Sequence, residues 1–188
     1  IGDVSGKGVP AALFMFMTRA LIRVYGLEEE GPARTLLKTN RMLAADNETT
    51  MFVSVIYAEY DLRSGKMVVA NGGHSPPLLC TATGSRLVES EPDPLLGPFP
   101  DSFFTEGSFT MAPGEALVFY TDGITEAQTT DGSFYGEKRL VDWFDGQRER
   151  HPDRLCLELI KDVQEFCRDA PQYDDITILA FRVNELRA

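Results

Sequence analysis

The sequence predicts an α+β protein in which two antiparallel sheets face each other and helices cover their outer faces. Two observations lead to this prediction. Helical segments stand near both ends of the 188-residue chain, and short β-branched and aromatic segments separated by turns lie between them. Runs of antiparallel strands flanked by helices are typical of layered α+β packing. The length fits one domain, and we expect residues 1–188 to form it.

The N-terminal part is expected to contain two helices. The first should run from Val9 to Tyr25, because Pro10 suits a first turn and Gly26 suits the stop. Apolar residues cover most of its circumference, which predicts burial on more than one side, against a sheet and against a second helix or a partner chain. The second helix is expected from Pro32 to Ala45. Its buried stripe should consist of Leu36, Leu37 and Leu43.

Strands follow these helices. Met51 to Tyr60 is rich in β-branched and aromatic residues, the turn "DLRSGK" comes next, and "MVVANGGH" and "PPLLCTA" resemble further strands. We interpret the three segments as an antiparallel meander. Residues Thr83 to Gly114 are rich in Gly, Pro and Ser, and we expect a strand pair interrupted by turns there, not a domain linker.

The C-terminal part alternates strands and helices. The continuous apolar run from Ala116 to Tyr120 predicts a central strand that is covered on both faces. "TTDGSFYG" is expected to be a loop. Helices are expected over Lys138 to Arg148 and Pro152 to Asp169, and "YDDITILAFRV" predicts a closing strand.

Composition excludes several classes of function. The formal net charge of −11 argues against a nucleic-acid-binding face and against adhesion to anionic membranes. The longest apolar run, Val9 to Met17, is far shorter than the ~20 residues that span a bilayer. The three cysteines do not have zinc-finger spacing, so we expect free thiols in a reducing, cytoplasmic compartment.

Four aspartates fall where the predicted strands begin or end. Asp3 follows the opening residues of the first expected strand, Asp122 follows "ALVFYT", and Asp174 and Asp175 precede "ITILAF". If these carboxylates converge at one rim, they would suit a hard cation such as Mg²⁺ or Mn²⁺. Each motif alone has a simpler interpretation, because "TDG" is usually a turn and an acidic pair is commonly solvated. The glycine loop that precedes the first helix matches neither a P-loop nor a dinucleotide fingerprint.

Four motifs occur in an order that resembles one family. "GDVSGKGVPAALF", "NGGHSPPLL", "LVFYTDGITEA" and "YDDITILAF" resemble the SpoIIE-type bacterial protein serine phosphatases, a branch of the metal-dependent type 2C (PPM) phosphatase superfamily. The resemblance implies a four-layer α/β/β/α sandwich. It also implies a serine/threonine phosphatase that acts on phosphoserine of a small anti-anti-sigma-like protein in partner-switching regulation of sigma factors.

The resemblance also implies roles for individual residues. Asp3 would bridge two Mn²⁺ or Mg²⁺ ions, and Val4 would offer its backbone carbonyl to one of them. Asp122 and Asp174 would be further ligands, with Asp175 a less certain neighbour. These carboxylates would be catalytic through a metal-activated water. Gly2, Gly6 and Gly123 would let the backbone approach the ions.

The sequence departs from the superfamily pattern at two positions of interest. Ser5 stands where eukaryotic type 2C enzymes have a histidine proposed as general acid, so protonation of the leaving group would have to come from elsewhere. His74 stands where the superfamily has an aspartate that binds a third, weaker metal. Because hard metals prefer oxygen ligands, we interpret His74 as a structural turn histidine.

Regulation and assembly are also predicted. We expect an N-terminal sensor or receiver domain in the full-length protein, a possible homodimer through the first helix, and a switch in which a partner shifts that helix and Asp3. An acidic motif of the type "GGDFYD" precedes "GDVSGKG" in the family and does not occur here. We therefore expect an N-terminally truncated domain that is weakly active or inactive and prone to self-association.

Two other functions remain open at this stage. One is a catalytically impaired scaffold that binds phosphoproteins or a partner without hydrolysis. The other is a different hydrolase with two metal ions and a carboxylate site, such as a nuclease, which the acidic charge balance disfavours.

Overall fold

The computed structural model describes residues 1–28, 30–45, 47–88, 93–146 and 152–184. These residues divide into two compact units. The first lies within Ile1–His74 and Ser90–Thr110, and the second lies within Ser75–Glu89 and Met111–Ala188. Each unit holds one antiparallel sheet and two helices.

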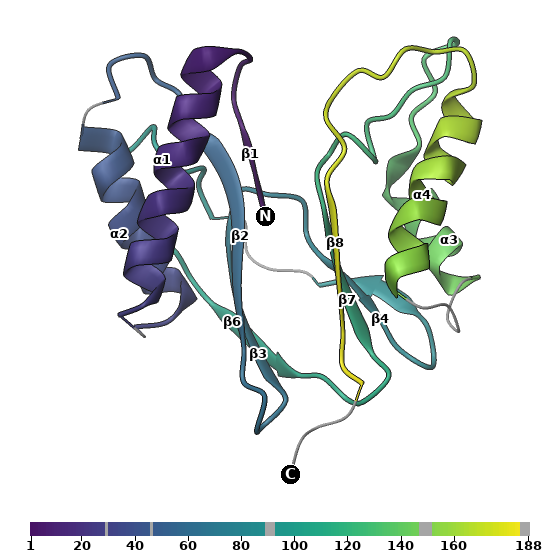
Figure 1. Ribbon diagram of the computed structural model, residues 1–188, viewed down its shortest axis with the longest axis horizontal. Coiled ribbons are helices and arrows are strands. Elements are labelled where there is room, and N and C mark those ends of the chain that lie inside the picture. The colour runs from purple at the N-terminus through teal and green to yellow at the C-terminus, as the bar shows by residue number, and fades with distance from the viewer. Residues whose placement is uncertain (29, 46, 89–92, 147–151, 185–188) are drawn as a thin grey trace. The chain divides into compact units, whose positions relative to one another are not determined.

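The first unit carries a four-stranded sheet in the order β1-β2-β3-β6. Its elements are β1 (Gly2–Val4), α1 (Val9–Gly26), α2 (Pro32–Ala45), β2 (Val53–Tyr60), β3 (Lys66–Gly72) and β6 (Gly107–Thr110). The two helices lie along one face of this sheet (Figure 1). Phe14, Leu36, Leu43, Val53, Val55 and Ala70 belong to the buried cluster between helices and sheet. The expected bounds of both helices are confirmed to within one residue.

The second unit carries the sheet β5-β4-β7-β8. Its elements are β4 (Leu78–Cys80), β5 (Ser85–Leu87), β7 (Ala116–Tyr120), α3 (Gly136–Asp145), α4 (Pro152–Cys167) and β8 (Ile178–Arg182). Its two helices also cover one face of the sheet (Figure 1). Val118, Tyr120, Leu140, Phe144, Leu159 and Val163 are among the buried residues that join the sheet to these helices.

The strand β7 has the central place that its continuous apolar run predicts. All five of its residues are buried, and it pairs antiparallel with β4 on one side and β8 on the other. A strand that pairs along both edges and is buried along its whole length favours apolar side chains, which explains the continuous apolar sequence. Asp122 follows this strand after a single residue, so the pairing of β7 sets where its backbone lies.

Two expectations about strand pairing are wrong. The expected meander ends at β3, because β4 lies in the other sheet and pairs with β5 and β7. The expected strand pair between Thr83 and Gly114 does not form either. The first of its strands, β5, pairs with β4, while the second, β6, pairs with β3. Short strands of similar composition can pair with any free edge, so local pattern alone does not select the partner.

The helix α1 buries less of its surface than its apolar sequence predicts. Ala11, Phe14 and Thr18 are its buried residues, whereas Val9, Leu13 and Phe16 are exposed by 71%, 63% and 67%. By length and composition α1 could also cross a membrane, a criterion that core helices of ordinary proteins and signal sequences meet as well. Whether a partner chain covers the exposed side, as expected for a dimer, stays a prediction.

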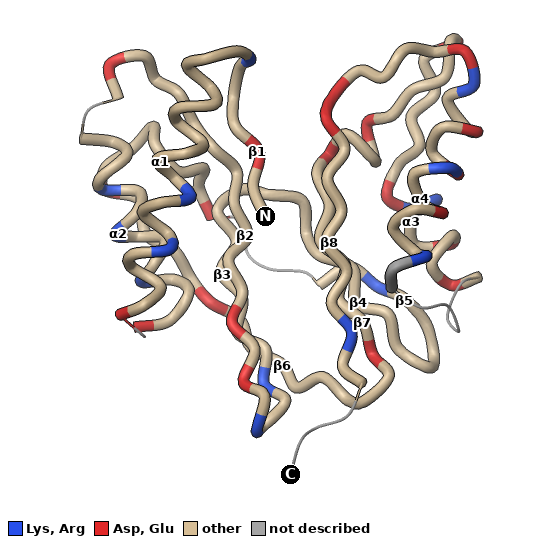
Figure 2. The backbone as a smooth tube through the Cα atoms, viewed as in Figure 1, with Lys and Arg blue, Asp and Glu red and all other residues tan. Residues whose placement is uncertain are grey.

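Charged residues of both signs alternate along α3 and α4 (Figure 2). Such mixed faces do not form the basic stripe that nucleic-acid binding needs. The three cysteines are partly buried and form no disulfide among the described residues.

Candidate metal centre

Asp122 and Asp174 lie at the same edge of the second sheet. The antiparallel pairing of β7 with β8 places Tyr120 opposite Ile178, so the end of β7 and the start of β8 coincide. Asp122 follows that end and Asp174 precedes that start. A carboxylate oxygen of Asp122 and one of Asp174 lie within 4.8 Å of each other.

Thr121 joins the two segments that carry these aspartates. Its amide donates to the carbonyl oxygen of Thr177 at 3.1 Å, and its hydroxyl donates to the carbonyl oxygen of Asp175 at 3.0 Å. The same hydroxyl accepts the amide of Thr177 at 2.9 Å. Three hydrogen bonds through one residue hold the two carboxylates at a fixed separation.

The side chain of Asp122 fits a cation. Its Oδ1 atom is buried and accepts no hydrogen bond from any residue that the structure describes. A buried carboxylate oxygen without a donor is costly, and a second carboxylate nearby raises that cost. A divalent cation would compensate both charges with the oxygen ligands that Mg²⁺ and Mn²⁺ prefer. The donor set therefore fits the metal that the sequence predicts.

Glu126 is a third acidic group at this site, and the sequence reasoning missed it. Burial raises the pKa of its carboxyl, and the negative charges of Asp122 and Asp174 raise that pKa further. Its amide donates to the carbonyl oxygen of Asp122 at 2.7 Å. The spacing of four residues in "DGITE" was an available signal, since one helical turn brings residues i and i+4 together.

Asp3 belongs to the first unit, where it lies in the middle of β1. This strand pairs antiparallel with β2, with Asp3 opposite Ser54 and Val4 opposite Val53. Ser5, the residue that replaces the histidine of eukaryotic enzymes, anchors the end of the strand. Its amide donates to the carbonyl oxygen of Phe52, and its hydroxyl accepts the amide of Phe52, both at 2.9 Å.

The glycines near the candidate ligands have reasons in the packing of the chain itself. A Cβ atom on Gly2 would lie 2.7 Å from the carbonyl oxygen of Ser54, so only glycine allows this pairing of β1 with β2. Gly6 adopts a φ of 81°, a conformation that L side chains rarely adopt. Asp175 is exposed, and its amide donates to Oδ1 of Asp174 at 2.9 Å.

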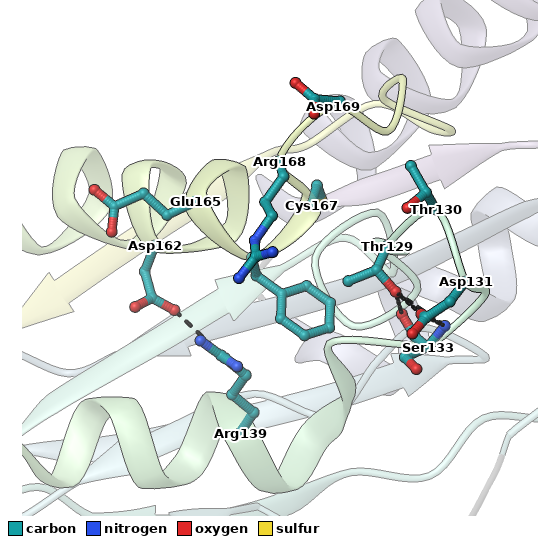
Figure 3. A pocket seen from close by; sticks show the side chains of 11 residues that line it. Thr129, Thr130, Asp131, Ser133, Arg139, Asp162, Glu165, Cys167, Arg168 and Asp169 are labelled. Carbon is teal, nitrogen blue, oxygen red and sulfur yellow. Dashed lines mark hydrogen bonds and ion pairs between the residues drawn. The ribbon is translucent and has the colours of Figure 1, made fainter.

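The second unit contains two neighbouring cavities, of which the smaller lies beside this edge. The smaller, of about 170 Å³, is lined by Gly123, Tyr173 and Ile176, which flank the candidate ligands in sequence. The larger, of about 690 Å³, lies between the loop that contains Thr129 to Ser133 and the end of α4 (Figure 3). Cys167 and Arg168 line both cavities.

Arg139 lines the larger cavity and contacts three neighbouring side chains. Its guanidinium lies 4.6 Å from the centre of the Phe166 ring and 5.1 Å from that of Tyr135. It also pairs with Asp162 at 3.7 Å (Figure 3), while the hydroxyl of Tyr135 donates to the same carboxylate at 2.7 Å. Stacked and paired in this way, Arg139 is part of the scaffold.

A family model covers almost the whole of this chain. Residues 1–184 match the family model described as Stage II sporulation protein E (SpoIIE). This chain belongs to the SpoIIE family. The resemblance inferred from four short motifs is thereby confirmed over nearly the whole sequence.

Two curated relatives extend this family assignment. Protein IcfG of Synechocystis is 29% identical over 96% of this chain and 32% of its own length. Phosphoserine phosphatase RsbU of Bacillus subtilis is 27% identical over 97% of this chain and 54% of its own length. The chain thus spans between a third and about half of these relatives.

Solved structures confirm the predicted fold class. The SiaA-PP2C domain of Pseudomonas aeruginosa has a TM-score of 0.84 at 22% identity and covers 97% of this chain and 73% of its own. A Mycobacterium tuberculosis structure with RsbU and RsbW domains has a TM-score of 0.82 at 27% identity. The match covers 100% of this chain and 51% of that structure's chain. The catalytic domain of the serine/threonine phosphatase PstP, solved with two manganese ions, has a TM-score of 0.70 at 11% identity. The match covers 97% of this chain and 86% of the PstP chain.

These matches confirm an α+β fold of the PPM type for this SpoIIE-family chain. The relative RsbU is named a phosphoserine phosphatase, which agrees with the enzyme class that the sequence predicts. The roles of Asp3, Val4, Asp122, Asp174 and Asp175 stay predictions, as does a single domain over residues 1–188.

Proposed function

We propose that this SpoIIE-family chain is the catalytic part of a metal-dependent protein serine/threonine phosphatase. Its substrate is phosphoserine on a small regulatory protein of the anti-anti-sigma type. The observation that carries the proposal is the carboxylate pair of Asp122 and Asp174, whose oxygens lie within 4.8 Å, with Oδ1 of Asp122 buried and without a donor in the described residues.

The proposed ligands are Asp3, Asp122 and Asp174 with the backbone carbonyl of Val4, and Asp175 is their acidic neighbour. When bound, two Mn²⁺ or Mg²⁺ ions supply an activated water at neutral pH and neutralise charge on the phosphoryl oxygens. The manganese ions of PstP support this choice of metal. Asp122 contributes a desolvated oxygen that attracts a cation strongly, and Thr121 keeps the second carboxylate at a fixed distance from it.

The substrate class follows from charge and from the relatives. A net charge of −11 disfavours a polynucleotide substrate, and the relative RsbU is named a phosphoserine phosphatase. We further propose that the whole protein works in cytoplasmic partner switching, with an N-terminal sensor or receiver domain. The exposed apolar side of α1 supports a contact with such a domain or with a second copy.

The first test separates this function from a scaffold and from a nuclease. Manganese-dependent hydrolysis would be measured on p-nitrophenyl phosphate, on a phosphoserine protein and on DNA. We expect activity on the first two substrates and none on DNA. Asp122→Asn should lower turnover by more than the ~10–100-fold that groups behind a metal ligand typically contribute.

The matched control for this variant is Asp131→Asn. Asp131 lies in the same unit, and its carboxylate accepts hydrogen bonds within its own loop, from the hydroxyl of Thr129 and the amide of Ser133. Because it is not a proposed ligand, the Asp131→Asn protein should be as active as wild type. A folded Asp122→Asn protein with wild-type manganese-stimulated activity would refute the site. Binding of the phosphoprotein without hydrolysis would instead favour the scaffold.

A second test addresses the substrate. Phosphoserine and phosphotyrosine forms of candidate regulatory proteins would be incubated with the intact protein, and loss of phosphate would be followed by mass spectrometry. We expect release from phosphoserine. Faster release from phosphotyrosine would contradict the proposed substrate class.

A further inference from the structure

A chain of polar side chains leads to Asp3 across the first sheet. The pairing of β1 with β2 places Asp3 directly opposite Ser54, and residues that are directly opposite in an antiparallel pair project from the same face. The hydroxyl of Ser54 lies 2.7 Å from Nδ1 of His74 and 3.5 Å from the carbonyl oxygen of Asp3. The strand that carries a proposed metal ligand therefore contacts His74 through a single side chain.

His74 is itself fixed by a second residue. Asn71 donates from Nδ2 to the carbonyl oxygen of His74 at 2.9 Å, and its Oδ1 accepts the amide of His74 at 2.8 Å. Both residues are buried, with exposures of 9% for Asn71 and 7% for His74. Both bonds join Asn71 to the main chain of His74, so they fix the backbone from which the imidazole projects.

The contact with Ser54 goes beyond what a turn requires. A turn histidine would need only the two main-chain bonds from Asn71, which close the turn after β3. Nδ1 of the imidazole contacts the side chain of a residue that lies 20 positions earlier, on the neighbouring strand β2. A hydroxyl has one proton, so when Ser54 donates to the carbonyl of Asp3 its oxygen accepts from Nδ1–H of His74.

The strand β1 is short and lies at the edge of its sheet. It has three residues and, among the described residues, it pairs with β2 along one edge only. The ends of the strand are anchored by Ile1, which bonds Ile56, and by Ser5, which bonds Phe52. The hydroxyl of Ser54 contacts the middle of the strand, at the carbonyl oxygen of Asp3, the proposed metal ligand.

We propose that the chain Asn71–His74–Ser54 is a positioning device that sets the place of Asp3 for metal binding. The inference rests on the proposed function, and it gives His74 a role that is neither that of a metal ligand nor only that of a turn residue. Ser54 and His74 act through Asp3, so both are positioning residues. Groups that orient a metal ligand typically contribute ~10–100-fold to metal affinity or activity.

The test compares manganese affinity with folding stability in the intact protein. Affinity would be measured by isothermal titration calorimetry and stability by urea unfolding without metal. Ser54→Ala and His74→Leu should each weaken manganese binding by about tenfold or more. Ser54→Thr keeps the hydroxyl and His74→Asn keeps a group at the place of Nδ1, so both should retain affinity within a few-fold.

Two further variants sharpen the result. Ser64→Ala removes a serine hydroxyl that bonds Asp61 at the distant turn of the same hairpin, and it should leave manganese affinity unchanged. Both changes break the same chain of contacts. The double variant Ser54→Ala/His74→Leu should therefore lose no more manganese affinity than whichever single variant binds manganese less tightly.

The outcomes distinguish the two proposals. An intact protein that binds manganese but hydrolyses no phosphoester refutes the proposed function, while the affinity comparison still decides the role of Ser54 and His74. Ser54→Ala or His74→Leu proteins that lose stability but bind manganese like wild type would overturn the positioning role. So would failure of Ser54→Thr to restore what Ser54→Ala loses, or an absence of manganese binding by wild type.

Discussion

Gly123 packs directly against the main chain of Asp175. A Cβ atom at Gly123 would lie 2.5 Å from the carbonyl oxygen of Asp175, a distance that a real side chain does not allow. The contact joins the segment after β7 to the segment before β8, and so brings Asp122 and Asp174 to the same edge. The glycine of "TDG" is thus required by packing against a distant segment as well as by any local turn.

This contact makes Gly123→Ala informative. The added methyl meets main-chain atoms that cannot move aside cheaply, so we expect a loss of about 1–3 kcal/mol in the free energy of unfolding and weaker manganese binding. Urea unfolding and calorimetric titration would measure the two effects. Gly107→Ala is the control, since a Cβ there meets nothing within 4 Å. Unchanged stability and affinity in Gly123→Ala would show that the two segments can separate freely.

Glu126→Gln tests the third acidic group. The raised pKa means that the folded, metal-free protein binds this proton more tightly than the unfolded chain does. The charged carboxylate therefore lowers stability at neutral pH, and that penalty disappears as the pH falls. At pH 7 the metal-free variant should be at least as stable as wild type, yet it should bind manganese a few-fold more weakly because an attractive charge is lost.

The control for this prediction is Glu165→Gln, which removes a charge from the exposed side of α4. Glu165→Gln should change neither the metal-free stability at pH 7 nor the affinity for manganese. A Glu126→Gln protein with lower metal-free stability at pH 7 would contradict the direction of the electrostatic effect.

Two phenylalanines of α1 should respond very differently to substitution. Phe14 is 8% exposed and packs in the cluster with Leu36 and Val53, whereas Phe16 is 67% exposed. Phe14→Ala should cost about 3–5 kcal/mol of unfolding free energy, and Phe16→Ala should stay within about 0.5 kcal/mol. Urea unfolding measures both. A large loss for Phe16→Ala would indicate that this face of α1 is covered, for example by a second copy.

Cys80 gives the stability a defined pH dependence. Burial raises the pKa of its thiol to about 11, from 9.0 in the absence of perturbation. The unfolded chain therefore loses the proton first, and stability that is complete below pH 9 falls as the pH rises towards 11. Between pH 8 and pH 10 wild type should lose about 1 kcal/mol more than Cys80→Ala. Parallel unfolding curves for the two proteins would show that the thiol titrates normally.

The sequence by itself determined the types of element and the family, and it predicted a metal site. Local periodicity gave α1, α2 and β7 nearly to the residue, because a helix or a fully buried strand imposes its own spacing of apolar residues. Carboxylates at strand ends indicated a hard metal, since oxygen ligands suit such ions. Four short motifs identified the SpoIIE family, which the match over residues 1–184 confirmed.

Only the tertiary structure decided the relationships between distant residues. It assigned β4 and β6 to their sheets, exposed one side of α1, placed Gly123 against Asp175 and joined Ser54 to His74. Strand partners, close backbone approaches and buried hydrogen bonds join residues that are far apart in sequence. Their free energy depends on which surfaces meet in the folded chain, and no local pattern of residues specifies that.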